Sequence, residues 1–352
     1  MASLQKAAYW GIKAGNPDAV ACWNVFASHN RAQLEEIRAN ETGPYFETFN
    51  LHHYAPFDAY PSLYADFREV SGGRPLWVTE CAMPLRWSGD EAKKELSDDD
   101  LKEQARRLVK VFAGSLHEGS RATFYFLLPH YVEGPTQFGI IRPDLTPRPA
   151  YAALAAVGRL LADARPIGRV KHDRYRIYGF SAKPDGQEAI VLVAWSDQGT
   201  GPYSLPETPK ASYDHLGRPS VPAKDVELTA SPQYFLFEGQ PYAATDLESS
   251  PPPPETISDR PCPVVLQAVW PESATDLKQS AYRIPANGGE IPIFVYHFGV
   301  GTASGKVQVD APSGWTFDLP SVAELEPGDR LAWRLRLQPP QGIGADVHTV
   351  RI

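Results

Sequence analysis

The sequence predicts an α/β region followed by two all-β regions. In roughly the first 165 residues, apolar runs alternate with amphipathic stretches, the order expected of parallel strand–helix units. From about residue 166 the pattern changes to short alternating segments separated by Gly, Pro, Asp and Ser, which is typical of antiparallel sheets. A proline-rich stretch then divides this all-β part in two.

The helix and strand signals begin with a helix rather than a strand. Residues 3–14 form an amphipathic pattern that stops at Gly15, and the apolar run AVACWNVF, residues 19–26, is expected to be a strand. Asn30 has a side chain suited to cap the next helix, RAQLEEIRA, at residues 31–39. The chain therefore opens with one helix and one complete strand–helix unit.

Three further strand–helix units follow. Strands are expected at residues 46–52, 76–80 and 122–128, and their helices at about 62–70, 98–119 and 150–164. Ser97 and Pro149 stand where such helices begin, since serine caps a helix and proline needs no N–H at the first position. Four units after a lone helix predict the second half of a (βα)8 TIM barrel, strands five to eight.

The two longest loops of this region, residues 81–96 and 129–148, both follow strand ends. Barrels of this kind assemble their active sites on that face.

The predicted domains are four consecutive ranges. A partial barrel takes residues 1–165, an antiparallel β-sandwich 166–248, and the linker SSPPPPETISDRP 249–261. Residues 262–352 have strand lengths and spacing of an immunoglobulin-like domain, which we expect to be incomplete.

Composition and charge exclude several classes of partner. The 352-residue chain has a net charge of −8 and no Lys/Arg-rich run, so binding to nucleic acid is not expected. No apolar stretch approaches the length of a membrane span. The three cysteines stand far apart without metal-ligand spacing, and neither a metal nor an organic cofactor is predicted.

Three segments, in order, carry a resemblance to clan A glycoside hydrolases, which are retaining TIM-barrel enzymes. LHHYAP at 51–56 is similar to their sixth strand and RPLWVTECAMP at 74–84 to their seventh. FYFLLPHY at 124–131, with FGIIRPDLTPRPAYAAL at 138–154, is similar to the eighth strand and last helix.

The all-β regions resemble modules appended to such enzymes. YDHLGRP and LTASPQYFLFEG look like an attached β-sandwich, and GKVQVDAPSGWTFDLP with LEPGDR looks like an Ig-like domain of secreted glycosidases. The resemblance implies an extracellular or periplasmic protein that acts on an oligo- or polysaccharide.

Glu80 ends the LWVTE strand, where this resemblance places the catalytic nucleophile. Strand alternation puts Leu76, Val78 and Glu80 on one face, so an apolar row would end in a carboxylate at the barrel mouth. A retaining enzyme uses such a carboxylate to form a covalent glycosyl-enzyme intermediate. The alternative is a surface Glu in an ion pair.

His53 and Tyr54 close the preceding strand, where clan A enzymes present a Tyr or His that hydrogen-bonds the nucleophile. Tyr54 is the first choice, because a hydroxyl donor keeps a carboxylate ionised. The alternative is that the histidines cap a core.

Aromatic and polar side chains complete the predicted substrate site. Trp87, Tyr125 and Phe126 could stack on a sugar ring, as could Trp23, although each could also be core. In the loop after the last barrel strand, His130, Glu133 and Gln137 could bind sugar hydroxyls or be simply solvated.

The acid/base partner of Glu80 is not expected in this chain, since the resemblance places it on a fourth strand that has no counterpart here. Loop carboxylates are available but unassigned: Glu41, Glu47, Asp58 and Glu133. A half barrel would also leave parallel edge strands open, so a missing N-terminal half or self-association is expected.

The function predicted is a retaining glycoside hydrolase that is inactive as this chain alone. The alternative is a non-catalytic carbohydrate-binding or scaffold protein.

Overall fold

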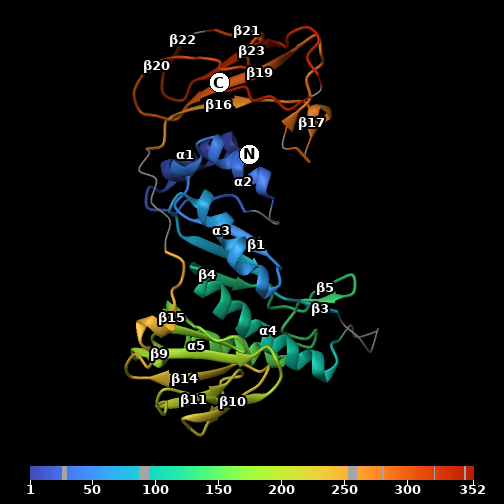
Figure 1. Ribbon diagram of the computed structural model, residues 1–352. Coiled ribbons are helices and arrows are strands. Elements are labelled where there is room, and N and C mark those ends of the chain that lie inside the picture. The colour runs from blue at the N-terminus through green and yellow to red at the C-terminus, as the bar shows by residue number, and fades with distance from the viewer. Residues whose placement is uncertain are drawn as a thin grey trace. The chain divides into compact units, whose positions relative to one another are not determined.

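The computed structural model describes residues 1–25, 30–86, 95–252, 260–276, 278–279, 281–320, 322–344 and 346–352. Contacts divide the chain into two compact units. The first unit holds Met1–Asn24, Asn30–Glu47 and Thr256–Ile352, and the second holds Val25–His29 and Thr48–Glu255. Each unit mixes helices with β-sheets, and antiparallel sheets predominate (Figure 1). The four sequence-defined domain ranges stay a prediction.

The second unit contains a three-stranded parallel sheet with strand order β1-β2-β4. Its strands are β1 (Phe49–His53), β2 (Leu76–Cys81) and β4 (Ser120–Tyr125). The helix α3 (Tyr60–Ser71) connects β1 to β2, and α4 (Asp98–His117) lies between β2 and β4 in the chain. These elements confirm the strands and helices predicted between residues 46 and 128, with bounds shifted by a few residues.

Both helices begin or end as their sequences predict. The Ser97 side chain accepts a hydrogen bond from the backbone N–H of Asp100 at 3.2 Å, and acidic residues fill the first turn of α4. Gly72 ends α3 in the left-handed conformation that glycine adopts without strain. Capping thus fixes where each helix meets its strand.

The strand predicted at residues 19–26 is wrong for the part that the structure describes. Residues 19–25 contain only an isolated bridge at Cys22, and residue 26 lies outside the described residues. The backbone of Ala21 bonds instead to Glu47, through the carboxylate at 2.7 Å and the peptide N–H at 2.6 Å. Ala21 and Trp23 are buried, so the apolar run reflects burial and not strand pairing.

The rest of the second unit is largely antiparallel. A small antiparallel sheet, β3-β6-β5, joins β3 (Leu85–Arg86), which follows β2, to β6 (Thr136–Gln137) and β5 (Val132–Glu133), which follow β4. The helix α5 (Pro149–Leu160) comes next in the chain. A seven-stranded sheet follows in the order β12-β11-β14-β9-β8-β7-β15. Its strands are β7 (Arg165–Val170), β8 (Tyr175–Ala182), β9 (Ala189–Ser196), β11 (Ala211–Asp214), β12 (Pro219–Ser220), β14 (Gln233–Phe237) and β15 (Leu247–Glu248), and β10 (Gly201–Ser204) pairs separately with β13 (Asp225–Leu228).

One core joins the helical and the antiparallel parts of this unit. Leu108 of α4 and Val157 of α5 belong to the same buried cluster as Phe180 and Trp195 of the large sheet. Burial of such side chains contributes about 1.5–3 kcal/mol each. The parallel sheet is therefore anchored through α4 to the β-sandwich region.

The first unit combines two helices with antiparallel sheets. The helices are α1 (Ala2–Gly15) and α2 (Arg31–Ala39), and both confirm the helices predicted there. Its main sheet has the order β16-β19-β23-β21, with bounds Val264–Ala268, Gly289–His297, Arg330–Gln338 and Thr316–Asp318. Two pairs complete it, β17 (Thr275–Asp276) with β18 (Ala281–Tyr282) and β20 (Ala303–Lys306) with β22 (Val322–Leu325).

Within the described residues, no helix is both long and apolar enough to cross a membrane.

Candidate active site at the end of the parallel sheet

Glu80 lies near the carboxyl end of the central strand β2, and a β-bulge decides where its side chain points. Leu51 pairs with Val78, but the next residue of β1 pairs with Glu80, so Thr79 is the extra residue. Because of this bulge, Leu76, Val78 and Cys81 are buried, whereas Glu80 is on the partly exposed side. The expectation that Leu76, Val78 and Glu80 share one face is therefore wrong.

Both carboxylate oxygens of Glu80 have a partner from the end of β1. The Tyr54 hydroxyl donates a short hydrogen bond to Oε1, and Nδ1 of His52 lies 3.5 Å from Oε2. The Glu80 side chain is 25% exposed, so it is held in place yet open to a ligand. A carboxylate with a hydroxyl donor and an open face can act as a nucleophile.

The Tyr54 hydroxyl is kept protonated by its surroundings. Burial raises its pKa most, and the hydrogen bond to Glu80 and the negative charge of that carboxylate raise the pKa further. The charges of Cys81 and Glu133 act in the same direction, which places Glu133 in the same electrostatic environment as Tyr54. Tyr54 is therefore a hydrogen-bond donor at neutral pH.

His53 is placed away from Glu80. Its Nε2 is 2.9 Å from the Tyr64 hydroxyl, and its ring packs edge-on against Tyr60 of α3 at 4.8 Å. Burial lowers the His53 pKa to about 4, so the ring is neutral. Its environment fits the alternative reading, in which a histidine at the strand end caps the core.

His52 is a contact of Glu80 that the sequence interpretation missed. Strand alternation contains the signal, because His52 and Tyr54 are two residues apart and must share a face, whereas His53 takes the other. The motif LHHYAP therefore supplies two partners for Glu80 and one side chain for the core.

Phe126 lies beside this group, in a cluster of aromatic rings. Its ring centroid is 6.3 Å from that of Tyr54 and 5.5 Å from that of Phe138, and Phe138 is 5.7 Å from Tyr54. Tyr131, from the same loop, packs against both phenylalanines at 5.8 Å. These rings form one wall around the Tyr54 side chain.

The other predicted aromatic residues are not brought to Glu80. Tyr125 packs against the buried cluster under α4, and burial raises the pKa of its hydroxyl. Trp23 belongs to the first unit, where it is buried against Phe46. Trp87 lies outside the described residues.

His130 is held within its loop. Its Nδ1 is 3.2 Å from Nη2 of Arg148 and 3.4 Å from Nε2 of Gln137. Arg148 in turn forms two hydrogen bonds with Glu95. Sequence interpretation missed Arg148 and Glu95, since a buried ion pair between residues 53 positions apart leaves no local pattern.

The other loop carboxylates considered as partners of Glu80 have different neighbours. Glu47 pairs with Lys13 at 2.9 Å in the first unit, and Asp58 lies 3.5 Å from Arg176. Among the described residues, no group of three or more His, Cys, Asp and Glu could hold a metal ion. Glu133 is the one of these acids whose charge acts on Tyr54.

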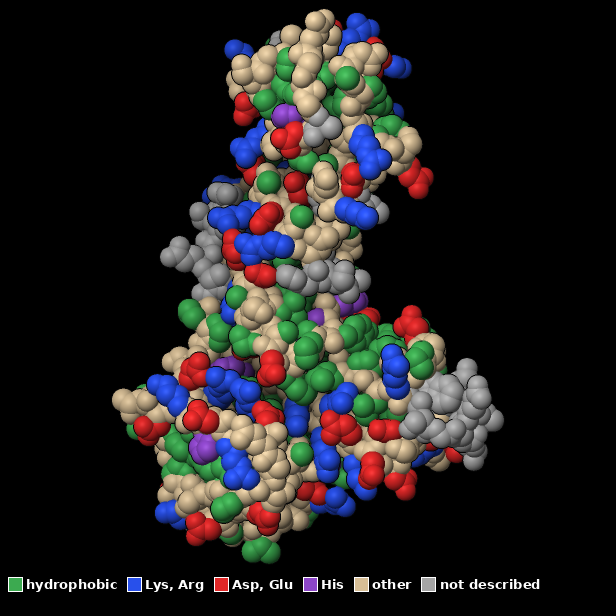
Figure 2. Space-filling view, turned by 45° about the vertical axis from the view of Figure 1, so that its right-hand side comes forward, with side chains coloured by type: hydrophobic (Ala, Val, Ile, Leu, Met, Phe, Trp, Pro, Cys, Tyr) green, Lys and Arg blue, Asp and Glu red, His purple; other side chains and the backbone are tan. Residues whose placement is uncertain are grey.

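The sheet face that bears Glu80 is rich in exposed aromatic side chains. Phe124 of β4 is 51% exposed, and its ring lies 6.5 Å from that of Trp77 on β2. Tyr54, Leu128 and Tyr131 are also exposed, and Figure 2 shows hydrophobic side chains gathered among charged ones at the surface. Such a patch is typical of a ligand or protein contact.

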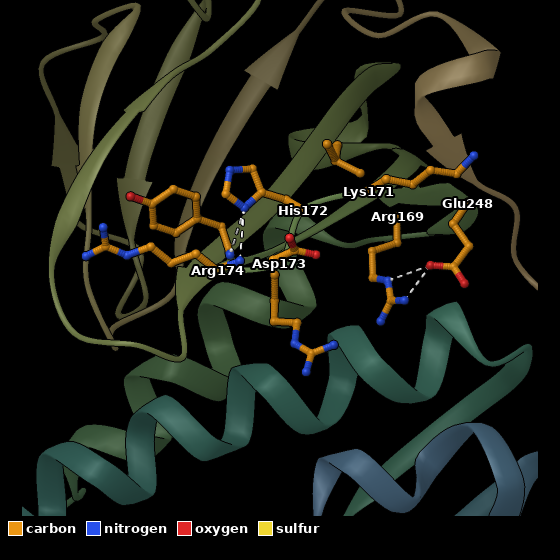
Figure 3. Close-up of a pocket in the computed structure, with 9 residues that line it drawn as sticks. Arg169, Lys171, His172, Asp173, Arg174 and Glu248 are labelled. Carbon is orange, nitrogen blue, oxygen red and sulfur yellow. Dashed lines mark hydrogen bonds and ion pairs between the residues drawn. The ribbon is translucent and has the colours of Figure 1, made fainter.

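A cavity of about 500 Å³ lies at the turn between β7 and β8 beside β15. Its lining is mostly charged, and two of its arginines are in ion pairs: Arg169 pairs with Glu248, and Arg176 is 2.7 Å from Asp197, which lies outside the lining. Figure 3 shows the Arg169–Glu248 pair and His172 bonded to the backbone of its own turn. This pocket lacks the exposed carboxylate with a hydroxyl donor that Glu80 has.

Comparison with protein families gives a match in the C-terminal part of the chain. Residues 298–352 match the family model of the NPCBM-associated, NEW3 domain of alpha-galactosidase. No curated protein matches the chain.

Among solved structures, the chain resembles a family 39 glycoside hydrolase from the gut symbiont Bacteroides cellulosilyticus WH2. The TM-score is 0.52 at 19% identity, over 68% of this chain and 54% of that one. N2152 from Neocallimastix frontalis matches with a TM-score of 0.41 and 9% identity, over 68% and 66% of the two chains. An Anoxybacillus alpha-amylase matches with a TM-score of 0.28 and 10% identity, over 66% and 73%.

The chain spans about half the length of the family 39 enzyme. At this identity the comparison shows a shared fold only.

Proposed function

We propose that this chain is the nucleophile-bearing part of a secreted retaining glycoside hydrolase that acts on oligo- or polysaccharides. Glu80 attacks the anomeric carbon, and a glycosyl-enzyme ester forms at its carboxylate while the leaving oxygen departs. Water then hydrolyses the ester with net retention. The observation that carries the proposal is the hydrogen bond from Tyr54 to Glu80 at the carboxyl end of a parallel sheet.

The site geometry supports the nucleophile role over that of a general acid. The Tyr54 hydroxyl donates to Oε1 of Glu80, an arrangement in which the carboxylate accepts, and the His52 ring lies beside Oε2. Phe126 and the exposed Phe124 offer ring faces near the sheet end, where a sugar could stack.

The active site is proposed to be completed by further strand–helix units of a TIM barrel. In the described residues the sheet has three parallel strands, with β1 and β4 at its edges. Parallel sheets are normally covered on both faces, whereas here Phe124 is half exposed. The added part would also supply the acid/base, which the resemblance to clan A enzymes places on the fourth barrel strand.

A pair of substrates that differ only in the leaving group tests the proposal. A dinitrophenyl glycoside needs little protonation to depart, so Glu80 alone should release one equivalent of dinitrophenol in a burst. The matched methyl glycoside needs an acid and should not react with this chain. A burst that survives in Glu80→Gln would refute the nucleophile assignment.

A second candidate is a carbohydrate-binding protein without hydrolytic activity. The exposed aromatic side chains Tyr54, Phe124 and Tyr131 favour it, because sugar rings stack on such rings. Binding of an oligosaccharide without any burst would support this candidate.

A further inference from the structure

Arg148 is the most completely bonded charged side chain near the site. It immediately precedes α5, and its side chain is 0% exposed. Nε and Nη2 bind the two carboxylate oxygens of Glu95 at 2.8 and 3.1 Å, which is the bidentate arrangement of strong ion pairs. Nη1 donates to the carbonyl oxygens of Gly139 and Ile141 at 2.8 and 3.0 Å. With Nη2 also 3.2 Å from His130, all five guanidinium N–H groups can be used.

These bonds fix the loop between β4 and α5. The Gly139 carbonyl also accepts from Nε2 of Gln104 on α4 at 3.1 Å, and the Gly139 N–H donates to the Gln137 side chain at 2.9 Å. A methyl group on Gly139 would lie 2.4 Å from the carbonyl oxygen of Pro129, so the two ends of the loop touch there. The loop is thus closed on itself and bound to α4.

The fixed loop carries the aromatic wall of Tyr54. Phe138 directly precedes Gly139, and its N–H donates to the Tyr131 carbonyl oxygen at 3.0 Å. Both rings pack on Phe126, and Phe138 also contacts Tyr54 edge-on. Tyr54 is already 39% exposed, and a shift of the loop would remove the Phe126 and Phe138 rings from its other side, admit more water and weaken its hold on Glu80.

We infer that Arg148, through Glu95 and the carbonyls of the 129–141 loop, is a positioning residue for the Tyr54–Glu80 pair. The role of Arg148 in catalysis rests on the proposed function, whereas its effect on the position of Tyr54 does not. A buried ion pair could serve stability alone, and removal of one partner would then lower stability without a specific effect on Tyr54. The two roles differ in what happens to the Tyr54 hydroxyl.

Tyrosine ring carbons labelled with ¹³C report the ionisation of Tyr54 by NMR without any substrate. The signal is assigned by its loss in Tyr54→Phe. In the wild-type chain Tyr54 should remain protonated at pH values where exposed tyrosines ionise, because burial comes first among the causes that raise its pKa. In Arg148→Gln, water should reach the hydroxyl, and its ionisation constant should rise about tenfold or more, one pKa unit being tenfold.

Two further variants make the result specific. Arg148→Lys cannot form the bidentate and carbonyl contacts together, so it should restore only part of the wild-type behaviour. Arg159→Gln is the matched control, because Arg159 is also on α5 but forms its ion pair with Asp185 at the surface. It should leave the Tyr54 signal unchanged.

An unchanged Tyr54 titration in folded Arg148→Gln would overturn the inference. Should that variant fail to fold, Glu95→Gln removes the charge while keeping the side-chain size, and an unchanged Tyr54 signal there would overturn it equally. If the Tyr54 signal shifts in Arg148→Gln but Glu80 of the wild-type chain does not react with an activated glycoside, the positioning role of Arg148 stands and the proposed catalysis is rejected.

Discussion

The Tyr54 hydroxyl donates a hydrogen bond to Oε1 of Glu80 and so connects the ends of two adjacent parallel strands. The bulge at Thr79 turns Glu80 to the partly exposed face, where Tyr54 and His52 already lie. Three polar side chains therefore meet at one sheet end; strand pairing fixes His52 and Glu80, and Tyr54 directly follows β1. This arrangement is the structural basis of the predictions that follow.

Tyr54→Phe removes the donor while keeping the ring. A hydrogen bond to a charged group is worth about 1.5–3 kcal/mol, so the rate of reaction of Glu80 with an activated glycoside should fall about 10- to 100-fold. Stopped-flow release of dinitrophenol measures the rate. Tyr151→Phe, at an exposed tyrosine of α5, is the control and should react like wild type. Equal rates for both variants would contradict the role of Tyr54.

His53 should make stability fall in mild acid. Its pKa is about 4 in the folded chain because the ring is buried, and about 6.5 when unfolded. Between these values the unfolded chain binds more protons than the folded chain. The contribution of His53 to the free energy of unfolding is therefore fully present above about pH 6.5 and is lost as the pH falls toward 4. Between pH 7 and 5 the loss from His53 should be about 2 kcal/mol.

Urea unfolding at the two pH values measures this loss. His53→Gln should lose about 2 kcal/mol less than wild type over the same interval, while His117, whose pKa is also lowered to about 4, keeps its own contribution. The same pH dependence in the variant and in wild type would show that His53 is not responsible.

Two Gly→Ala substitutions should have opposite effects on stability. At Gly139 the added methyl would meet the Pro129 carbonyl oxygen and the His130 backbone, which cannot move aside cheaply, so Gly139→Ala should cost about 1–3 kcal/mol. Gly158, inside α5, has open space, and Gly158→Ala should stabilise by about 0.5–1 kcal/mol. Thermal unfolding of both variants checks the sign. A neutral Gly139→Ala would mean that the loop is looser than described.

The chain alone should not hydrolyse glycosides with poor leaving groups. Cleavage of such a bond requires protonation of the departing oxygen, and the proposed acid/base belongs to a barrel strand other than β1, β2 and β4. Release of methanol from a panel of methyl glycosides is the measurement. Sustained turnover would show that an acid/base exists within this chain, and Glu133→Gln would then be the first variant to examine.

Local patterns predicted the helices and strands of the parallel region well. Ser97 caps α4, and Gly72 ends α3, because these signals depend on a few neighbouring residues. The apolar run 19–26 was misread, since burial of Ala21 and Trp23 gives the same composition as a strand. Periodicity alone does not distinguish the two.

The candidate site was predictable in part. The segments LHHYAP and RPLWVTECAMP indicated Tyr54 and Glu80 from their positions at strand ends. The bulge at Thr79 depends on pairing with β1 and cannot be predicted from the sequence of β2. Arg148 and Glu95 meet only after folding, so their role could not be read from spacing. Long-range contacts of this kind require the structure.

The measurement that tests the central claim most directly is peptide mass spectrometry after reaction with an activated 2-fluoro-sugar. The fluorine slows hydrolysis of the intermediate, so the glycosyl group stays on the nucleophile. We predict one added glycosyl mass on the peptide that contains Glu80, and none in Glu80→Gln. A label on another carboxylate, or none on the wild-type chain, would contradict the account.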